Sequence, residues 1–207
     1  MPDLLLIPGF ATDLRIPFLR RTRPVDGGFS AFRREVGQGR ADVFRWGIAE
    51  SVPLSRAFSL RPYLQLYQRE RARADMPDVA ERLWQKMEQM KPATVFCHSM
   101  GARVLLNAAR RYGLPPSVKR IVFVQADMPM DEPKPKAFAA CRVQNLFCPW
   151  DPLLAVSALA HHVWRAGQRG WDVEGVENLP FALLRPFNLH TASIRSPRLR
   201  HAFAKGQ

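Results

Sequence analysis

The chain has little cysteine and no long apolar run. Its three cysteines, at positions 97, 141 and 148 of 207 residues, are too few and odd in number for a disulfide framework. No stretch of about 18 consecutive apolar residues is present, so we expect no membrane span. The start holds only a short apolar run, Leu4 to Ile7, without a basic flank before it, which is not typical of a signal peptide. We therefore expect a cytoplasmic protein in a reducing compartment.

The sequence also lacks the spacings that bind metals, phosphates or nucleic acids. It has no zinc-ligand pattern, no glycine-rich phosphate loop and no basic run interleaved with aromatic residues. His161 and His162 are adjacent, and adjacent residues do not lie on one helix face as ligands four residues apart do. We therefore expect no metal, no cofactor and no nucleic-acid partner.

The charge balance is strongly positive, with a formal net charge of +13 at pH 7. Such a surface either attracts an anionic partner (nucleic acid, anionic lipid or an acidic substrate) or is the solvated surface of a protein from an arginine-favouring genome. Because no recognition motif accompanies the charge, we favour the second interpretation.

Length and composition indicate one domain spanning residues 1–207. With 47% hydrophobic residues, a chain of this length can bury a sizeable core. Apolar runs typical of buried strands alternate with segments of helical periodicity. We expect strands near 4–7, 41–46, 94–97, 118–126, 141–148 and 171–177, and helices near 79–90, 101–112 and 155–165. The alternation predicts an α/β fold, a three-layer sandwich with a mainly parallel central sheet.

Residues 51–91 are predicted to hold a loop and two helices. The first helix, within 51–75, either overhangs a site as a partial lid or packs on the core. Asp75 or Asp78 is the expected cap of the second helix, with Pro77 in its first turn. Apolar residues at three- and four-residue spacing predict one buried stripe along that helix: Val79, Ala80, Leu83, Trp84, Met87 and Met90.

The stretch 93–106 carries the strongest functional signal. Its first half is an apolar run of strand-forming residues, and its second half has helical spacing. Between them the residues CHSMG, at 97–101, match the nucleophile elbow G-x-S-x-G with cysteine in the first position. Small residues flank such a serine because strand and helix approach closely there. Ser99 is therefore the predicted nucleophile.

A serine hydroxyl needs a histidine to take its proton and an acid to orient that histidine. In a parallel sheet such groups lie beyond the carboxyl ends of the strands. Asp151 comes directly after the strand 141–148 and is the preferred acid. Asp127, after the preceding strand, is the rival.

The preferred base is His190, on a loop that follows the last predicted strand. His98 lies beside Ser99 in the turn, so its side chain is expected to point away from that of Ser99. His161 and His162 fall inside a helix that leads away from Asp151, and His201 falls in a basic, mobile tail.

The order Ser99, Asp151, His190 resembles that of the α/β-hydrolase superfamily, in particular its small single-domain serine esterase-like members. The resemblance rests on the elbow at 97–101, on Pro8-Gly9-Phe10 where that family often has His-Gly-x, and on the turn at 150–153. Cysteine replaces the first elbow glycine, and no glycine precedes the histidine. The resemblance implies a compact fold without a cap domain, and an oxyanion hole formed by the backbone N–H groups of Phe10 and Met100.

These residues predict a serine hydrolase that cleaves a carboxylic ester, or a related acyl bond of a small molecule, through an acyl-enzyme. Two alternatives stay open. The chain is either a catalytically inactive α/β-hydrolase fold used for binding or scaffolding, or an acyltransferase that uses the same three residues.

Overall fold

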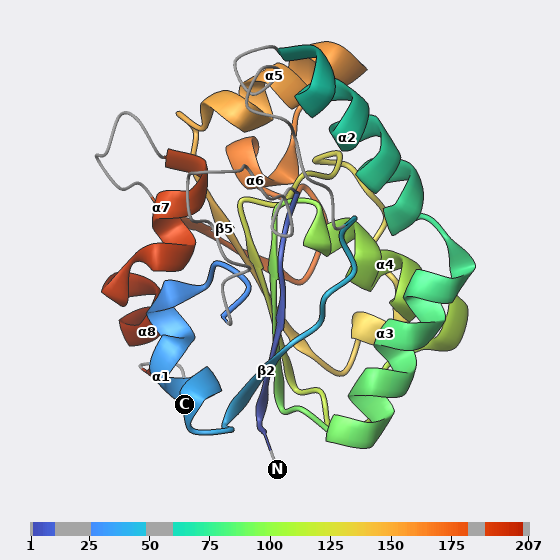
Figure 1. Cartoon of the computed structure of the whole chain (residues 1–207), viewed down its shortest axis with the longest axis vertical. Coiled ribbons are helices and arrows are strands. Elements are labelled where there is room, and N and C mark those ends of the chain that lie inside the picture. The colour runs from blue at the N-terminus through green and yellow to red at the C-terminus, as the bar shows by residue number, and fades with distance from the viewer. Residues whose placement is uncertain (1, 11–25, 49–59, 182–188, 205–207) are drawn as a thin grey trace.

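The computed structural model, which describes residues 2–10, 26–48, 60–181 and 189–204, is an α/β fold built on a six-stranded, all-parallel sheet (Figure 1). The strands follow the order β2-β1-β3-β4-β5-β6. Their bounds are β1 Leu4–Ile7, β2 Ala41–Val43, β3 Thr94–His98, β4 Arg120–Val124, β5 Arg142–Phe147 and β6 Val176–Pro180. The predicted fold class is confirmed.

Helices cover both faces of the sheet, with α2, α3 and α4 on one side and α1, α7 and α8 on the other (Figure 1). Helices α5 and α6 lie toward the upper end of the view. The bounds of the α-helices are α1 Arg33–Gly37, α2 Leu60–Ala74, α3 Pro77–Met90, α4 Gly101–Tyr112, α5 Pro152–His161, α6 Ala166–Arg169, α7 Leu189–Arg195 and α8 Pro197–Ala204. Two 3₁₀ turns, η1 Ser30–Phe32 and η3 Lys136–Phe138, complete the described elements.

The central strands are buried on both faces, as their unbroken apolar runs predict. Every residue of β1 and β3 is buried. Alternate residues of β1 enter different cores: Leu5 packs with the α3 and α4 stripe, while Leu6 packs with Phe29 and Phe32 on the other face. Burial on both faces fixes the strand register, because a one-residue slip exchanges the two faces.

The strand order reverses direction between β1 and β3. From β1 the chain moves outward to β2, and from β3 it moves the opposite way through β4, β5 and β6. A crevice opens at such a point beyond the carboxyl ends of the strands, where α/β proteins bind ligands. Phe10 follows β1 and Ser99 follows β3, so both lie at this position.

Several predicted boundaries are wrong, and local contacts explain them. The cap of α3 is Met76, which makes no side-chain cap bond, because the carboxylate of Asp75 is instead held by Arg103 of α4 at 2.6 and 2.8 Å. Trp84 is only half-buried and stacks on Tyr112 at the edge of the stripe. The predicted mobile tail forms helix α8.

The end of the sheet also differs from the prediction. Helix α5 begins at Pro152 because Asp151 caps it, and it ends at His161, before a left-handed residue at His162. Trp171 is no strand residue: it is fully buried, and its indole N–H donates to Glu132 O at 2.7 Å. Strand β6 therefore starts only at Val176.

Other predictions fall partly outside the described residues. The turn after Phe10 and the loop at 51–59 lie there, so the lid interpretation is tested only by α2, which packs against α3 and α4. Among the described residues, no helix is both long and apolar enough to cross a membrane.

Strand β1 and helix α4 approach each other closely at Gly101. A Cβ on Gly101 would lie 2.6 Å from the carbonyl oxygens of both Ile7 and Pro8. Such contacts are with rigid backbone, so a larger residue must push the first turn of α4 away from β1. The glycine of the elbow motif is therefore a packing requirement of this fold.

Replacing Gly101 by alanine is expected to destabilise the protein by about 1–3 kcal/mol, the usual cost of overpacking. The free energy of unfolding in urea measures this. The matched control is Gly37→Ala on α1, where no atom lies within 4 Å of the added Cβ. Equal stability of the two variants would contradict the close approach.

Candidate functional site

Ser99 sits at the tip of the sharp turn between β3 and α4. Its φ of 51° is in the left-handed region, which non-glycine residues rarely occupy. Backbone hydrogen bonds hold it there: its N–H donates to Val124 O at 3.0 Å, and its carbonyl accepts from the N–H groups of Ala102 and Asp127. Strain of this kind persists only where the surroundings over-determine it, as they do at many functional sites.

Gly9 allows the chain after β1 to lie directly against this turn. A Cβ on Gly9 would lie 2.7 Å from Ser99 Cβ and 3.0 Å from His98 Nδ1. Phe10 and Met100, whose backbone N–H groups are the predicted oxyanion donors, are the chain neighbours of Gly9 and Ser99. Neither N–H donates to an acceptor within the part of the chain that the structure describes.

Asp151 is fully buried four residues after the end of β5 and caps α5. Its Oδ1 accepts the N–H groups of Leu153 and Leu154 at 3.0 and 3.2 Å. Its Oδ2 accepts His190 Nδ1 at 2.6 Å. Burial alone would raise the pKa of Asp151, but the hydrogen bonds and the charge of His190 outweigh it and hold that pKa below its usual value.

The structure thus brings together Asp151 and His190, the two residues predicted as acid and base. His190 lies in the first turn of α7 rather than on a loop, so that part of the prediction is wrong. Among the described residues, the hydroxyl of Ser99 makes no hydrogen bond to the His190 ring. Hydrogen bonds between catalytic groups are often long before substrate binds and shorten in the complex.

The rival carboxylate, Asp127, is engaged elsewhere. Its Oδ1 accepts Ser157 Oγ at 2.7 Å and lies 3.3 Å from the Arg165 guanidinium, while its Oδ2 accepts Tyr67 Oη at 2.9 Å. Tyr67 in turn packs edge-on against Phe10, with ring centres 5.6 Å apart. Asp127 therefore joins α2 to α5 instead of orienting a histidine.

His161 and His162 lie at the end of α5 opposite to Asp151. The His161 ring stacks on Tyr67 and is contacted by the guanidinium of Arg71. Burial, together with that guanidinium, lowers the pKa of His161. His162 ends α5 in a left-handed conformation, and the backbone of His201 is part of α8.

His98 makes a contact that the sequence did not predict. Its Nε2–H donates to the carbonyl oxygen of His190 at 2.8 Å, and the two rings lie 4.8 Å apart. Complete burial, with the neighbouring His190, lowers the pKa of His98 to about 3. The ring is therefore neutral at physiological pH and ties the elbow to α7.

Gln125 is the other residue missed from sequence. It follows β4 with a φ of 48°, is fully buried, and donates its Nε2–H to Asp151 Oδ2 at 2.5 Å. Its Oε1 accepts the hydroxyl of Ser193, one turn beyond His190 on α7. Its position was the available signal, because Gln125, like Ser99, is a polar residue directly after a buried strand.

Within the described ranges, no group of three or more potential metal ligands comes together. The predicted site residues instead carry a hydroxyl, an imidazole and a carboxylate, of which the imidazole and the carboxylate are hydrogen-bonded to each other. No protein-family model, curated protein or solved structure matches the chain.

The neutral state of His98 has a consequence for stability. Between pH 6.5 and 3 the unfolded chain binds a proton at this histidine and the folded chain does not, so His98 destabilises the fold as the pH falls. We expect wild type to lose stability relative to His98→Asn by up to about 1.4 kcal/mol per pH unit in this window. Urea unfolding of both proteins at several pH values checks this. If the difference in unfolding free energy between wild type and His98→Asn stays constant with pH, the pKa of His98 is not lowered in the folded protein.

Proposed function

We propose that the protein is a serine hydrolase that cleaves an ester or related acyl bond, with Ser99 as nucleophile, His190 as base and Asp151 as acid. The observation that carries this proposal is the 2.6 Å hydrogen bond between His190 Nδ1 and buried Asp151 Oδ2. It lies at the same edge of the sheet as a serine held at positive φ. A buried carboxylate that orients a histidine is the arrangement that activates a serine.

In the first step, Ser99 Oγ attacks the acyl carbonyl carbon and His190 Nε2 takes the hydroxyl proton. Asp151 holds the proton of Nδ1, which fixes the tautomer with a basic Nε2 and stabilises the charged ring. The tetrahedral intermediate collapses, and His190 returns its proton to the departing alcohol. Water then attacks the acyl-enzyme by the same route, releasing the acid and the free serine.

The developing oxyanion is accepted by the backbone N–H groups of Phe10 and Met100. Met100 caps the first turn of α4, where the positive end of the helix dipole favours negative charge. One oxyanion donor is typically worth about 10²–10³ in rate.

We further infer that the chain is a small member of the α/β-hydrolase superfamily acting in a reducing cytoplasm. The parallel sheet, with its nucleophile candidate after β3 and its acid candidate after β5, supports the first inference. Three free cysteine thiols, at positions 97, 141 and 148, are consistent with the second. The substrate is a small acyl compound, with no cofactor involved.

Covalent labelling by a fluorophosphonate tests the nucleophile. We expect wild type to be labelled and Ser99→Ala not to be, because the reagent requires an activated serine. Ser117→Ala is the matched control: it lies before β4 at the opposite edge of the sheet, and its hydroxyl has no partner among the described residues. Equal labelling of wild type and Ser99→Ala would exclude this nucleophile.

Hydrolysis of short p-nitrophenyl esters tests the acid and base. We expect Asp151→Asn to lower kcat by about 10⁴-fold, because the amide stabilises the wrong tautomer of the histidine. His190→Ala should be similarly impaired, with KM changed much less than kcat. Turnover that persists in both variants would contradict the assignment, and absence of turnover in wild type would favour a binding protein or another acyl acceptor.

A further inference from the structure

The outer side of α5 is apolar and exposed. Leu153, Val156 and Leu159 are 56%, 58% and 76% exposed, and their three-residue spacing places them on one side of the helix. The opposite side, with Leu154 and Ala158, is buried. A helix that is apolar all round is normally enclosed by other apolar groups. The outer side of α5 is therefore suited to contact with an apolar partner.

Other large apolar side chains are exposed next to α5 in the chain and on the helix that contacts it. Trp150, 78% exposed, precedes the helix, and Trp164, 49% exposed, follows it. On the neighbouring helix α2, Leu64 is 56% exposed. The two helices are in contact, since Tyr67 Oη lies 3.2 Å from Ser157 Oγ. We call the set of exposed apolar residues the α2–α5 surface: Leu64, Trp150, Leu153, Val156, Leu159 and Trp164.

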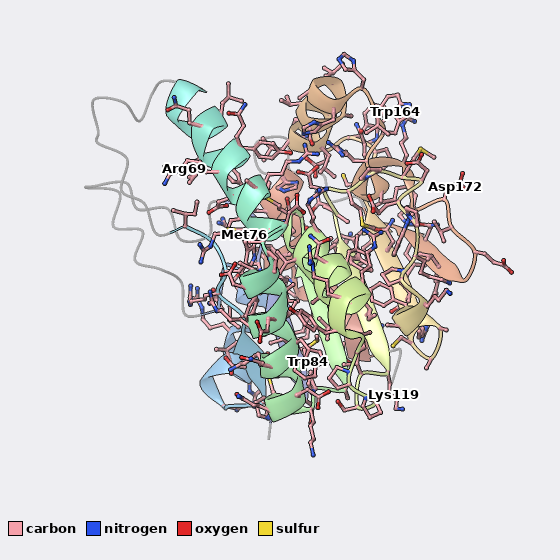
Figure 2. All side chains as sticks on the ribbon, turned by 90° about the vertical axis from the view of Figure 1, so that its right-hand side faces the viewer. Arg69, Met76, Trp84, Lys119, Trp164 and Asp172 are labelled. Atoms are coloured by element: carbon pink, nitrogen blue, oxygen red, sulfur yellow. The ribbon has the colours of Figure 1, made fainter. Side chains whose placement is uncertain are left out.

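The helices of this surface expose arginines and no carboxylate. Arg69 of α2 and Arg169 are exposed, and the guanidinium of Arg169 lies 4.4 Å from the centre of the Trp164 ring. Arg71 of α2 is half-buried, where it contacts His161. Between residues 149 and 172 the carboxylates are Asp151, which is fully buried, and Asp172, which is exposed near Trp164. Along α2 the only carboxylate is Glu70, which is fully buried. Arg69 and Trp164 lie toward the upper end of Figure 2, and Lys119 lies at the lower end.

We propose that the α2–α5 surface docks onto an anionic lipid surface. Apolar side chains with flanking tryptophans insert at the boundary of headgroups and acyl chains, and arginines bind lipid phosphates. A second copy of the chain is disfavoured as the occupant, because two surfaces of the same positive sign repel.

The position of the surface matters for the site. Asp151 is the N-cap of α5, so this helix begins at the carboxyl edge of the sheet. Docking through α5 would therefore hold that edge of the sheet close to the lipid. If the proposed function holds, on which this step rests, the substrate class is an ester carried by the membrane. Lipid binding itself does not depend on catalysis.

Co-sedimentation with vesicles tests the docking, using Ser99→Ala protein so that no turnover alters the lipid. We expect binding to phosphatidylcholine vesicles that contain phosphatidylserine, weaker binding at high salt, and little binding to phosphatidylcholine alone. Leu159→Asp should weaken the binding by about tenfold, because it places a charge in the apolar stripe. Because Leu159 is 76% exposed, the substitution removes little buried contact.

The matched control is Met76→Asp, which adds the same charge at a residue 47% exposed between α2 and α3, labelled in Figure 2. Aspartate is also a favourable cap for α3 there. We expect Met76→Asp to bind vesicles like its parent. Absence of binding to phosphatidylserine vesicles, or equal binding by Leu159→Asp and its parent, would overturn the proposal. Labelling of Ser99 in the wild-type protein would in that case still support the proposed hydrolase function, because that function does not depend on lipid docking.

Discussion

The arrangement of the site depends on one buried carboxylate that keeps its charge. An ionised group away from water is costly unless hydrogen bonds replace its hydration. Asp151 obtains them from three separate parts of the chain: the first turn of α5, Gln125 after β4, and His190 on α7. Displacing any of these parts leaves a buried negative charge under-solvated. The same interactions that stabilise the charge therefore fix where the three elements meet.

Close backbone packing provides the second constraint. Gly9 and Gly101 leave no room for a side chain between β1 and the elbow, and Gly167 leaves none between α6 and the end of β4. These tight contacts surround two residues with positive φ, Ser99 and Gln125, which end neighbouring strands. The unfavourable conformations are offset by backbone hydrogen bonds across the strand ends, such as that from Gln125 N to Leu146 O. Rigid backbone thus holds Ser99 and Gln125 in position.

The fold was predictable because buried parallel strands leave strong signals: apolar runs such as 4–7 and 94–97 are followed by turns and amphipathic helices. The pairing of Asp151 with His190 followed from chain order and strand ends. The contacts of His98 and Gln125 with α7 did not, because they join residues 92 and 68 positions apart and nothing in a single sequence marks such a partner. Helix boundaries failed where a polar side chain found a distant partner, as Asp75 did with Arg103.

Helix α7 belongs to the last fifth of the chain, yet its contacts reach back to the middle of the sheet. His190 meets His98 across 92 positions, and Ser193 meets Gln125 across 68. Closing such long segments is entropically costly, so contacts of this range tend to form late in folding. The sheet from β1 to β6 is synthesised before α7 exists. A nascent or truncated chain without α7 would thus lack the contacts of the elbow with His190, and the proposed reaction would begin only after α7 has been made.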